Sequence, residues 1–461
     1  MIRWFVVLVW LVSAWGEVLG VERFPPPEFD SGYKMPATTV PSPRAPWLEY
    51  LDVAVLLATL SLASYFVLRK RSRRPVFGLM LFSLAYFGFY RQGCICAIGS
   101  IQDVTLALSH PRYAVPFTVV VFFFLPLLFT VIFGRTFCAA VCPLGAIQDV
   151  VLVRPLKVRP WLEHALGWVP YLYLGAAVLF AATASAFIIC DYDPFVAFFR
   201  RSGSWGMLGL GTALLVIGMF VGRPYCRFLC PYGAVLSLVS RISKWNVTLS
   251  PADCIQCQLC DVACPFGAID EPVPAGPNGG PRLHAGRLAG SVVLLVALVG
   301  AGSWLGGRLS VPLSKVNPTV RLAERIAAED AGQVLEAPGL NPAAAGNGLP
   351  ALDRREETLR NASLAFRQTG RPAADLFAEA NTVRGQFAWG GCILGIFAGF
   401  VIGFKLISLS FRQPRTVYEP NRAACVACGR CYTYCPKELV RLKRIQGKKT
   451  IPLTPMSRPQ S

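Results

Sequence analysis

The chain has 461 residues, of which 54% are hydrophobic and only 15% are charged, and its mean hydropathy is +0.48. This length is enough for two or three soluble domains, but several apolar runs reach the ~20 residues that cross a bilayer core, which argues against a soluble protein. The formal net charge of +19 does not indicate nucleic-acid binding, because Lys and Arg cluster beside apolar runs, as in membrane proteins.

The N-terminal segment has the features of an exported or anchored protein. Residues 1–20 combine one Arg, a short apolar core and small residues at the end, which indicates a signal peptide or an uncleaved first anchor. Residues 21–48 are rich in proline and polar side chains. We expect them to form an extended, largely irregular segment outside the cytoplasm.

Seven apolar runs follow and predict an all-α polytopic membrane bundle. They cover residues 50–68, 76–90, 114–133, 169–189, 205–221, 290–305 and 389–409. Clusters of Lys and Arg follow the first, third, fifth and seventh runs. If the runs alternate across the bilayer, all these clusters lie on one side, which the positive-inside rule makes cytoplasmic. We therefore expect a multi-pass protein of the bacterial inner membrane.

This division predicts the domain organisation. We expect a five-span membrane core at residues 49–245, a first cysteine-rich half of a small module at 246–285, span six at 288–306, an extracytoplasmic helical loop at 307–388, span seven at 389–411, and the second half of that module with a basic tail at 412–461.

A short cysteine element occurs twice at predicted cytoplasmic span ends. FCAAVCPLGAIQDV starts at Phe137 and YCRFLCPYGAVLSL at Tyr225, and each follows a Gly-Arg pair. Four-residue spacing places both thiols of a C-x-x-x-C-P element on one face of a helix. Two such elements at one depth offer four thiols to an inner-face metal or redox centre: Cys138, Cys142, Cys226 and Cys230. The alternative is a reduced, buried structural set.

A degraded third copy, RQGCICAIGSIQDV from Arg91, lies on the predicted outer face. Four of the sixteen cysteines fall on that side, namely Cys94, Cys96, Cys190 and Cys392. The hydrocarbon core is ~30 Å thick, too wide for one electron-tunnelling step, so a cofactor at each face would help electrons cross. The alternative for the outer cysteines is a disulfide or inert thiols, because that compartment is oxidising.

Two longer cysteine strings dominate the sequence. CIQCQLCDVACP starts at Cys254 and CVACGRCYTYCP at Cys425, and both have the C-x-x-C-x-x-C-x-x-x-C-P spacing with which bacterial ferredoxins hold [4Fe–4S] clusters. The alternative, structural zinc, uses two C-x-x-C knuckles, whereas each string here has three evenly spaced cysteines.

The spacing also predicts how the ligands divide between two clusters. In two-cluster ferredoxins the fourth cysteine of each string ligates the other cluster. One cluster is therefore expected on Cys254, Cys257, Cys260 and Cys435, and the other on Cys425, Cys428, Cys431 and Cys264. The last two spans form a hairpin that returns the second string to the face of the first. We expect a small α+β cytoplasmic module built from two separated segments.

The remaining segments suggest docking surfaces. Between spans six and seven, TVRLAERIAAED and ADLFAEANTVRGQF show helical spacing and APGLNPAAAGNGLP interrupts it, so we expect amphipathic helices that form a cap or a partner site. A cap that only packs on the spans is the alternative. The basic tail after Cys435 suits an acidic ferredoxin or flavodoxin, or equally anionic lipid.

No catalytic constellation is evident. The three histidines, His110, His164 and His284, lie near span ends and do not form the matched pair that haem b requires. The chain has no Gly-rich phosphate loop, nucleophile elbow or paired carboxylates. Arg223 and Arg227 are suited to steady a reduced cluster or a quinone, although positive-inside anchoring explains them as well. These features predict an electron-transfer subunit rather than a stand-alone enzyme.

Together the motifs resemble the NapH/NosR family of membrane polyferredoxins, over roughly residues 77–444. The doubled C-x-x-x-C-P is fairly specific to that family, whereas the ferredoxin strings are not. The resemblance implies electron transfer between the quinone pool or cytoplasmic donors and a periplasmic reductase or flavoprotein. It also implies a ligand role for the eight ferredoxin cysteines and a role in electron input for the inner four.

The chain departs from the family in two respects. Its second ferredoxin string is separated from the first by a hairpin and an outer loop, which simpler NapH-like chains lack. NosR-type members carry a periplasmic flavin-binding domain with a Ser/Thr attachment motif before the spans, and this sequence has no such motif. We expect no covalent FMN and a separate partner that docks outside. The other class of function left open is a redox-sensing regulatory or maturation factor for a partner enzyme.

Overall fold

The computed structural model describes residues 45–93, 97–111, 113–249, 254–273, 282–283, 285–332, 351–409, 411–412 and 414–445. The predicted signal peptide or anchor, almost all of the Pro-rich segment, Cys94, Cys96, His284 and the end of the basic tail lie outside these residues.

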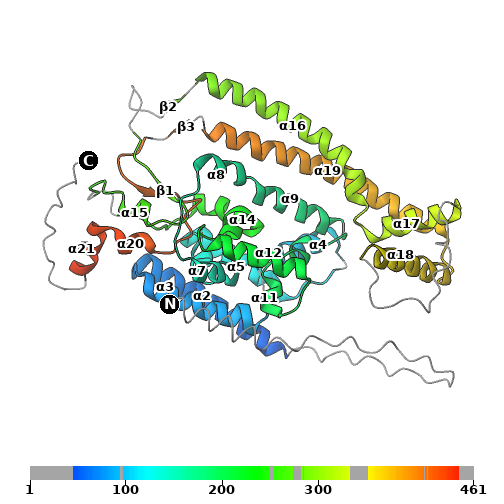
Figure 1. The fold of residues 1–461 in the computed structure, drawn as a ribbon, viewed down its shortest axis with the longest axis horizontal. Coiled ribbons are helices and arrows are strands. Elements are labelled where there is room, and N and C mark those ends of the chain that lie inside the picture. Colours follow the sequence, from blue (N-terminus) through cyan, green and yellow to red (C-terminus); the bar gives the residue numbers. More distant parts are fainter. Residues whose placement is uncertain are drawn as a thin grey trace. The chain divides into compact units, whose positions relative to one another are not determined.

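The N-terminal part of the described chain is helical throughout (Figure 1). Its first elements are α2 (Pro46–Ser64), η1 (Tyr65–Arg69), α3 (Arg73–Ser83), η2 (Leu84–Tyr90), α4 (Ser100–Ser109) and α5 (Phe117–Phe133). Then follow α6 (Thr136–Ala140), α7 (Pro143–Val151), α8 (Pro160–Leu166), α9 (Val169–Ala182), α10 (Ile188–Asp191), α11 (Val196–Arg200), α12 (Trp205–Gly218), α13 (Pro224–Phe228), α14 (Pro231–Val239) and η3 (Ser240–Ile242).

The C-terminal part alternates long helices with short strands. It contains α15 (Leu259–Val262), β1 (Ile269–Asp270), β2 (Arg282–Leu283), α16 (Ala285–Ser314), α17 (Pro318–Asp330), α18 (Ala351–Gln368), α19 (Ala373–Leu409), β3 (Phe411–Arg412), β4 (Glu419–Pro420), α20 (Arg430–Tyr434) and α21 (Pro436–Ile445).

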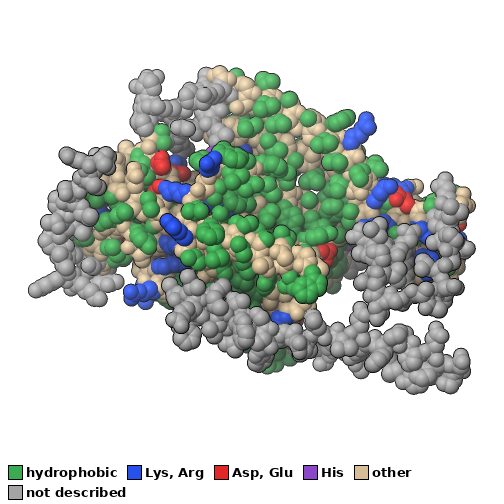
Figure 2. All heavy atoms as spheres, in the orientation of Figure 1, with side chains coloured by type: hydrophobic (Ala, Val, Ile, Leu, Met, Phe, Trp, Pro, Cys, Tyr) green, Lys and Arg blue, Asp and Glu red, His purple; other side chains and the backbone are tan. Residues whose placement is uncertain are grey.

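Four helical stretches in the described residues are long and apolar enough to cross a membrane: Trp47–Arg69, Pro160–Ala182, Leu288–Ser314 and Ala373–Ser408. Phe117–Phe133 and Trp205–Gly218 are shorter apolar helices. The predicted second run forms α3 and η2. Apolar side chains cover the middle of the visible face, whereas Lys and Arg lie toward its two ends (Figure 2). This is the surface of a helical membrane protein.

The degraded cysteine element repeats one hydrogen bond of the intact one. In the intact copy, Gln148 Oε1 accepts a hydrogen bond from the Tyr225 amide at 3.0 Å. In the degraded copy, Gln102 Oε1 accepts one from the Ile189 amide at 2.9 Å. Gln102 and Gln148 share the same place in the I-Q-D-V sequence, and each donor amide directly precedes a cysteine. The same contact, from a glutamine oxygen to the amide before a cysteine, therefore occurs twice in the core, between two different pairs of segments.

Glycines hold α16 and α19 side by side (Figure 1). A Cβ on Gly395 would lie 1.9 Å from Gly302 O, and one on Gly306 would lie 2.0 Å from Gly391 O. Backbones approach this closely in membrane helix pairs only where side chains are absent. The pair forms the predicted hairpin and returns the chain to the first cysteine string.

Beyond the hairpin, two pairs of short strands join the separated halves. Antiparallel β1 and β4 pair Ile269 with Pro420 and Asp270 with Glu419, and β2 pairs with β3. Asn421 N also donates to Ala268 O at 2.8 Å. Segments on either side of the hairpin thus build one small unit that contains α15 and α20 (Figure 1).

At the other end of the hairpin, α17, α18 and α19 form a small helical cap. Its core consists of Val320, Ala323, Ile326, Leu376 and Ala380. Both stretches with predicted helical spacing are helical, in α17 and in the first turns of α19. The sequence reasoning did not single out α18, whose amphipathic pattern is diluted by many charged residues.

Candidate metal centres

The loops of both ferredoxin strings adopt the same unusual backbone. Gln256 and Gln258 flank Cys257 with φ angles of +53° and +63°, and Ala427 and Gly429 flank Cys428 with φ angles of +54° and +73°. Left-handed residues within such loops turn successive backbone N–H groups toward one concavity, an arrangement that binds anions and iron–sulfur clusters. The similar sequence spacing therefore produces two similar cradles.

The structure brings the first predicted ligand set together across the hairpin. Cys254, Cys257, Cys260 and Cys435 line one cavity, which Tyr418 and Pro436 help to enclose. Burial, together with the neighbouring thiols of Cys435, Cys257 and Cys254, raises the pKa of Cys260 to about 11. Four thiols from two strings thus converge on one small space, which fits the ligand shell of a cubane cluster.

The second predicted set is more deeply placed. Burial raises the pKa of Cys425 to about 12, and the thiols of Cys428 and Cys264 add to the shift. Burial also raises the pKa of Cys431, with the thiols of Cys428, Cys425 and Cys264 as further causes. Because metals bind thiolates, loading either set must release protons.

The spacing of the thiols bears on the kind of metal group that they fit. Among the described residues, no three His, Cys, Asp or Glu side chains lie close enough to hold one metal ion. A cubane spreads its four thiolate ligands over four iron atoms, so they need not meet at one point. The converging thiols and the paired cradles fit this larger group.

The four inner cysteines lie where short helices begin. Cys142 and Cys230 are the N-caps of α7 and α14, and Gly233 N donates to Cys230 Sγ at 3.2 Å. The thiol of Cys230 has those of Cys226, Cys142 and Cys138 as electrostatic neighbours. The two repeated elements therefore bring their thiols together, and the N-terminal ends of two helices favour negative charge there.

Polar side chains contact the other two inner thiols. Gln148 Nε2 donates to Cys226 Sγ at 3.3 Å, and Arg135 Nη2 lies 3.9 Å from Cys138 Sγ. Arg135 also donates to the Ala423 carbonyl at 2.9 Å, two residues before Cys425. Arg135, from the Gly-Arg pair before the first element, thus links the inner thiols to the second string.

The three thiol sets adjoin one another. Cys431 has Cys260 of the first set among its electrostatic neighbours. Cys138 packs in the same apolar cluster as Cys264 and Cys425 of the second set. Gly222, before the second inner element, lies so close to Pro265 that a Cβ would be 2.6 Å from the Pro265 carbonyl oxygen. The sets therefore form a series from the ferredoxin unit to the membrane core.

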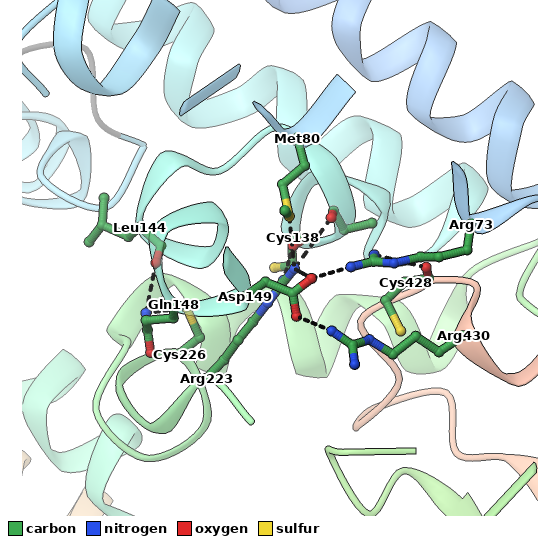
Figure 3. A network of polar contacts seen from close by, with 11 residues as sticks. Arg73, Met80, Cys138, Leu144, Gln148, Asp149, Arg223, Cys226, Cys428 and Arg430 are labelled. Carbon is green, nitrogen blue, oxygen red and sulfur yellow. Dashed lines mark hydrogen bonds and ion pairs between the residues drawn. The ribbon is translucent and has the colours of Figure 1, made fainter. Parts of the chain in front are cut away.

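A buried carboxylate organises the junction (Figure 3). Asp149 accepts hydrogen bonds from Arg73 and from Arg430, the latter at 3.1 Å, and Arg223 lies 3.6 Å away. Arg223 is 1% exposed and also donates to the carbonyl of Cys138. Arg73 donates to the Cys428 carbonyl at 3.2 Å. One carboxylate thus ties α3, α7 and the inner element to the second string.

Asp149 remains ionised despite its burial. Burial alone would raise its pKa, but the guanidinium groups of Arg223, Arg73 and Arg430 hold it at about 2. The sequence reasoning did not select Asp149 or Gln148. The available signal was the repetition of I-Q-D-V in two cysteine elements, which carries Gln and Asp as well as Cys.

A cavity of about 260 Å³ adjoins the inner thiols. Cys226 and Cys230 line it together with Arg135, Arg223 and Phe266. Its other side is formed by Glu163, His164, Tyr171 and Lys405, from the region of α8, α9 and α19. Tyr171 Oη and Ser237 Oγ are hydrogen-bonded at 2.9 Å, and Arg227 pairs with Glu163 at 2.6 Å.

The two outer cysteines that the structure describes have different surroundings. Cys190 is exposed at α10 and follows the amide that bonds to Gln102. Cys392 lies on α19, and its sulfur faces Gly307 of α16, where a Cβ would be 3.2 Å away. Cys94 and Cys96 lie outside the described residues.

Comparison with known proteins connects these elements to iron–sulfur proteins. The family described as a 4Fe-4S binding domain matches residues 115–161 and 204–250. Each matched range contains an apolar helix and one C-x-x-x-C-P element, so the matches cover the inner cysteines and stop before the ferredoxin strings. No solved structure matches the chain.

Curated relatives match parts of the chain. Regulatory protein NosR of Pseudomonas aeruginosa is 29% identical over 47% of this chain and 33% of its own length. Protein NirI of Paracoccus denitrificans is 27% identical over 52% of this chain and 39% of its own. Ferredoxin-type protein NapH of Haemophilus influenzae is 27% identical over 31% of this chain and 52% of its own.

The chain spans only about a third to half of the length of these relatives. The relatives nevertheless include the NosR-type and NapH-type proteins that the motifs predicted. The predicted resemblance is confirmed: the chain is similar to iron–sulfur membrane polyferredoxins of the NapH/NosR type.

Proposed function

We propose that the chain carries electrons singly between its ferredoxin unit and the membrane core, through three adjoining thiol sets. Iron–sulfur clusters supply one-electron redox chemistry when bound. The observation that carries the proposal is that Cys138 packs against the small apolar cluster that contains Cys428 and that Cys264 and Cys425 also contact, because this places an inner thiol beside a ferredoxin set.

The proposed ligands follow the crosswise pattern. The first [4Fe–4S] cluster takes Cys254, Cys257, Cys260 and Cys435, and the second takes Cys425, Cys428, Cys431 and Cys264. A further iron–sulfur or iron centre takes Cys138, Cys142, Cys226 and Cys230, which is supported by the 4Fe-4S family match over those residues. Arg135 and Arg223 place positive charge beside the thiolates, which stabilises the more negative, reduced state.

The cavity beside Cys226 and Cys230 is the proposed point of exchange with the quinone pool. It combines an aromatic side chain, Phe266, with groups that bind or release protons, among them His164, Glu163 and Lys405. A quinol that becomes a quinone gives up two electrons and two protons. Iron–sulfur centres held by the thiol sets would take the electrons one at a time, while the polar side of the cavity passes the protons to water.

The other end of the relay is proposed on the outer side. A periplasmic redox protein or flavoprotein is the expected partner there, and a cytoplasmic ferredoxin or flavodoxin is the alternative to quinone inside. The contact that Gln102 makes beside Cys190 repeats the one that Gln148 makes beside Cys226, which supports a redox role for Cys190. Cys392 packs against α16 instead, which favours a structural role.

A redox-sensing regulatory role is the second candidate, favoured by the relatives that are named regulatory proteins. The response to quinone separates the two functions. A relay requires that quinone oxidises the reduced protein and that quinol reduces it again. Clusters that ignore quinone while still changing with cellular redox state would favour the regulator.

The crosswise ligand pattern is tested by single Cys→Ser variants, an iron count and EPR during redox titration. We expect Cys260→Ser and Cys435→Ser to remove the same cluster signal, and Cys264→Ser and Cys431→Ser to remove the other. Cys392→Ser is the matched control and should keep every signal. Loss of one common signal in Cys431→Ser and Cys435→Ser would show that each string holds its own cluster, contrary to the proposal.

The inner centre is tested by Cys226→Ser. We expect this variant to keep both ferredoxin signals, to lose the iron of one further centre, and to slow re-reduction by quinol by at least about a hundredfold, because the thiols nearest the cavity are disrupted. Cys392→Ser again serves as control. Iron at about eight atoms per chain in the unmodified protein, unchanged in Cys226→Ser, would contradict an inner cluster.

A further inference from the structure

A second, larger groove, lined by other residues than the quinone cavity, plays no part in the proposed relay. Its volume is about 1300 Å³. Its walls come from three places: the junction of α2 and η1, the end of α5 with residues 244–249, and the second ferredoxin half at β4 and α21.

One wall of the groove is apolar and belongs to membrane helices. Tyr65 and Leu68 extend from the long apolar helix Trp47–Arg69, and Phe129 and Phe133 from the apolar helix α5. Trp245 stacks on Phe133 with ring centroids 5.4 Å apart. Tyr65 and Trp245 are 55% and 50% exposed, so this wall offers aromatic and aliphatic surface to an acyl chain.

The rim of the groove is strongly basic. Six cationic residues line it, namely Arg69, Lys70, Arg71, Lys244, Arg422 and Arg441, against two acidic residues, Glu419 and Glu438. Glu438 is fully buried and is engaged by Arg71 at 2.7 Å and by Arg441 at 3.5 Å. Arg69, Lys70 and Lys244 are exposed at the mouth of the groove, where they leave an excess of positive charge.

We propose that this groove binds one anionic phospholipid. The phosphate lies among Arg69, Lys70 and Lys244, and an acyl chain runs along Leu68, Phe129 and Phe133. The apolar wall continues the membrane helices and the cations lie at the ends of those helices, so the groove matches the acyl chain and the charged headgroup of a lipid in turn. A zwitterionic lipid would not satisfy the excess charge, and a soluble anion would leave the aromatic wall uncovered.

A lipid in this position has a structural consequence. The groove is closed on its third side by Glu419, Pro420 and Leu442, which belong to the half of the ferredoxin unit that arrives only after the membrane hairpin. A bound lipid therefore contacts both the membrane core and the second half, and it would hold them together beside the Arg71–Glu438 pair.

The test compares two charge-matched variants of the full chain, purified in mild detergent. Arg69→Gln/Lys244→Gln removes two cations from the mouth of the groove. Arg154→Gln/Arg159→Gln removes two exposed cations from elsewhere on the same predicted membrane face. Lipid retention is measured by mass spectrometry of extracted lipids, and affinity by native mass spectrometry with added phosphatidylglycerol or phosphatidylcholine.

We expect the unmodified protein to retain about one anionic lipid per chain and to prefer phosphatidylglycerol. Each removed charge should weaken binding about fivefold, so the groove variant should bind about 25-fold more weakly, while the control stays within about twofold. Ser61→Trp, which fills the groove wall without a charge change, should also displace the lipid. Iron content and EPR signals verify that every variant is folded.

Three outcomes would overturn the proposal. The first is equal weakening of lipid binding in the groove and control variants, which indicates general attraction to the membrane surface. The second is equal affinity for phosphatidylcholine and phosphatidylglycerol. The third is competition by inorganic phosphate at low millimolar concentration with no lipid retained, which indicates a soluble-anion site. Because none of these measurements involves electron transfer, failure of the lipid proposal would leave the proposed relay intact.

Discussion

Replacing Asp149 with asparagine is expected to lower the free energy of unfolding by roughly 3–5 kcal/mol, the usual cost of removing one partner from a buried ion pair. The carboxylate is fully buried and three guanidinium groups surround it. Without it, Arg223 at 1% exposure is left close to two other cations. We expect the second ferredoxin string to detach from the core, because Arg430 loses its carboxylate partner.

The effect should not depend on pH in the ordinary range. The arginines lower the pKa of Asp149 from 3.8 to about 2, so its stabilising contribution is complete above about pH 4 and is lost only as the pH falls towards 2. Thermal unfolding in detergent and iron content at neutral pH measure the change. Iron should be lost from the Cys425, Cys428, Cys431 and Cys264 set before the other ferredoxin set.

The outer copy of the same element supplies the control. Asp103 holds the position of Asp149 in the degraded element, but it is only partly buried and is bonded to the Tyr113 hydroxyl at 3.1 Å. Asp103→Asn should change the free energy of unfolding by less than about 1 kcal/mol, because it weakens one hydrogen bond and leaves no group of arginines without a carboxylate partner. An Asp149→Asn variant as stable and as iron-rich as Asp103→Asn would contradict the role of this junction.

A single added methyl group in the hairpin is the second change with a large expected effect. In Gly395→Ala the new Cβ would lie 1.9 Å from the carbonyl oxygen of Gly302, so α16 and α19 must separate. Overpacking of this kind costs about 1–3 kcal/mol where side chains can yield, and here the obstacle is backbone. Because α19 carries the second string back to the first, both ferredoxin clusters should be lost or destabilised together.

A glycine elsewhere on the same helix distinguishes packing from helix propensity. Nothing lies within 4 Å of a Cβ built on Gly300 of α16, so Gly300→Ala should be neutral or slightly stabilising. Gly306→Ala, with its Cβ 2.0 Å from Gly391 O, should resemble Gly395→Ala. Iron content and limited proteolysis of the hairpin provide the measurements. Full iron retention in both close-contact variants would show that the hairpin tolerates separation.

Local sequence patterns predicted the chemistry more completely than the architecture. The spacing of Cys254 to Cys264 and of Cys425 to Cys435 indicated cluster cradles, and both loops have left-handed residues on either side of the second cysteine. The positive-inside pattern predicted that a hairpin returns the second string, and β1 pairs with β4 beyond that hairpin. The cluster ligands and the cytoplasmic orientation stay predictions, whereas the loop conformations and the strand pairing are features of the structure.

Long-range contacts were missed where the sequence signal was weak. The repeat was recognised from its cysteines, so the equivalence of Ile189–Cys190 with Tyr225–Cys226 became evident only from the two glutamine contacts. Cys392 was grouped with the outer cysteines by predicted depth, but its neighbour is Gly307 on the adjacent helix. Depth in a membrane does not specify which face of a helix a side chain occupies.

The sequence by itself determined which thiols are suited to iron–sulfur chemistry and which segments are apolar enough for a bilayer, because spacing and hydrophobicity are local properties. Only the tertiary structure decided that the three thiol sets adjoin and that Asp149 joins them. That decision depends on contacts between residues as distant as Arg135 and Ala423, and such contacts are set by the packing of glycine-lined helices and the need to neutralise buried arginines.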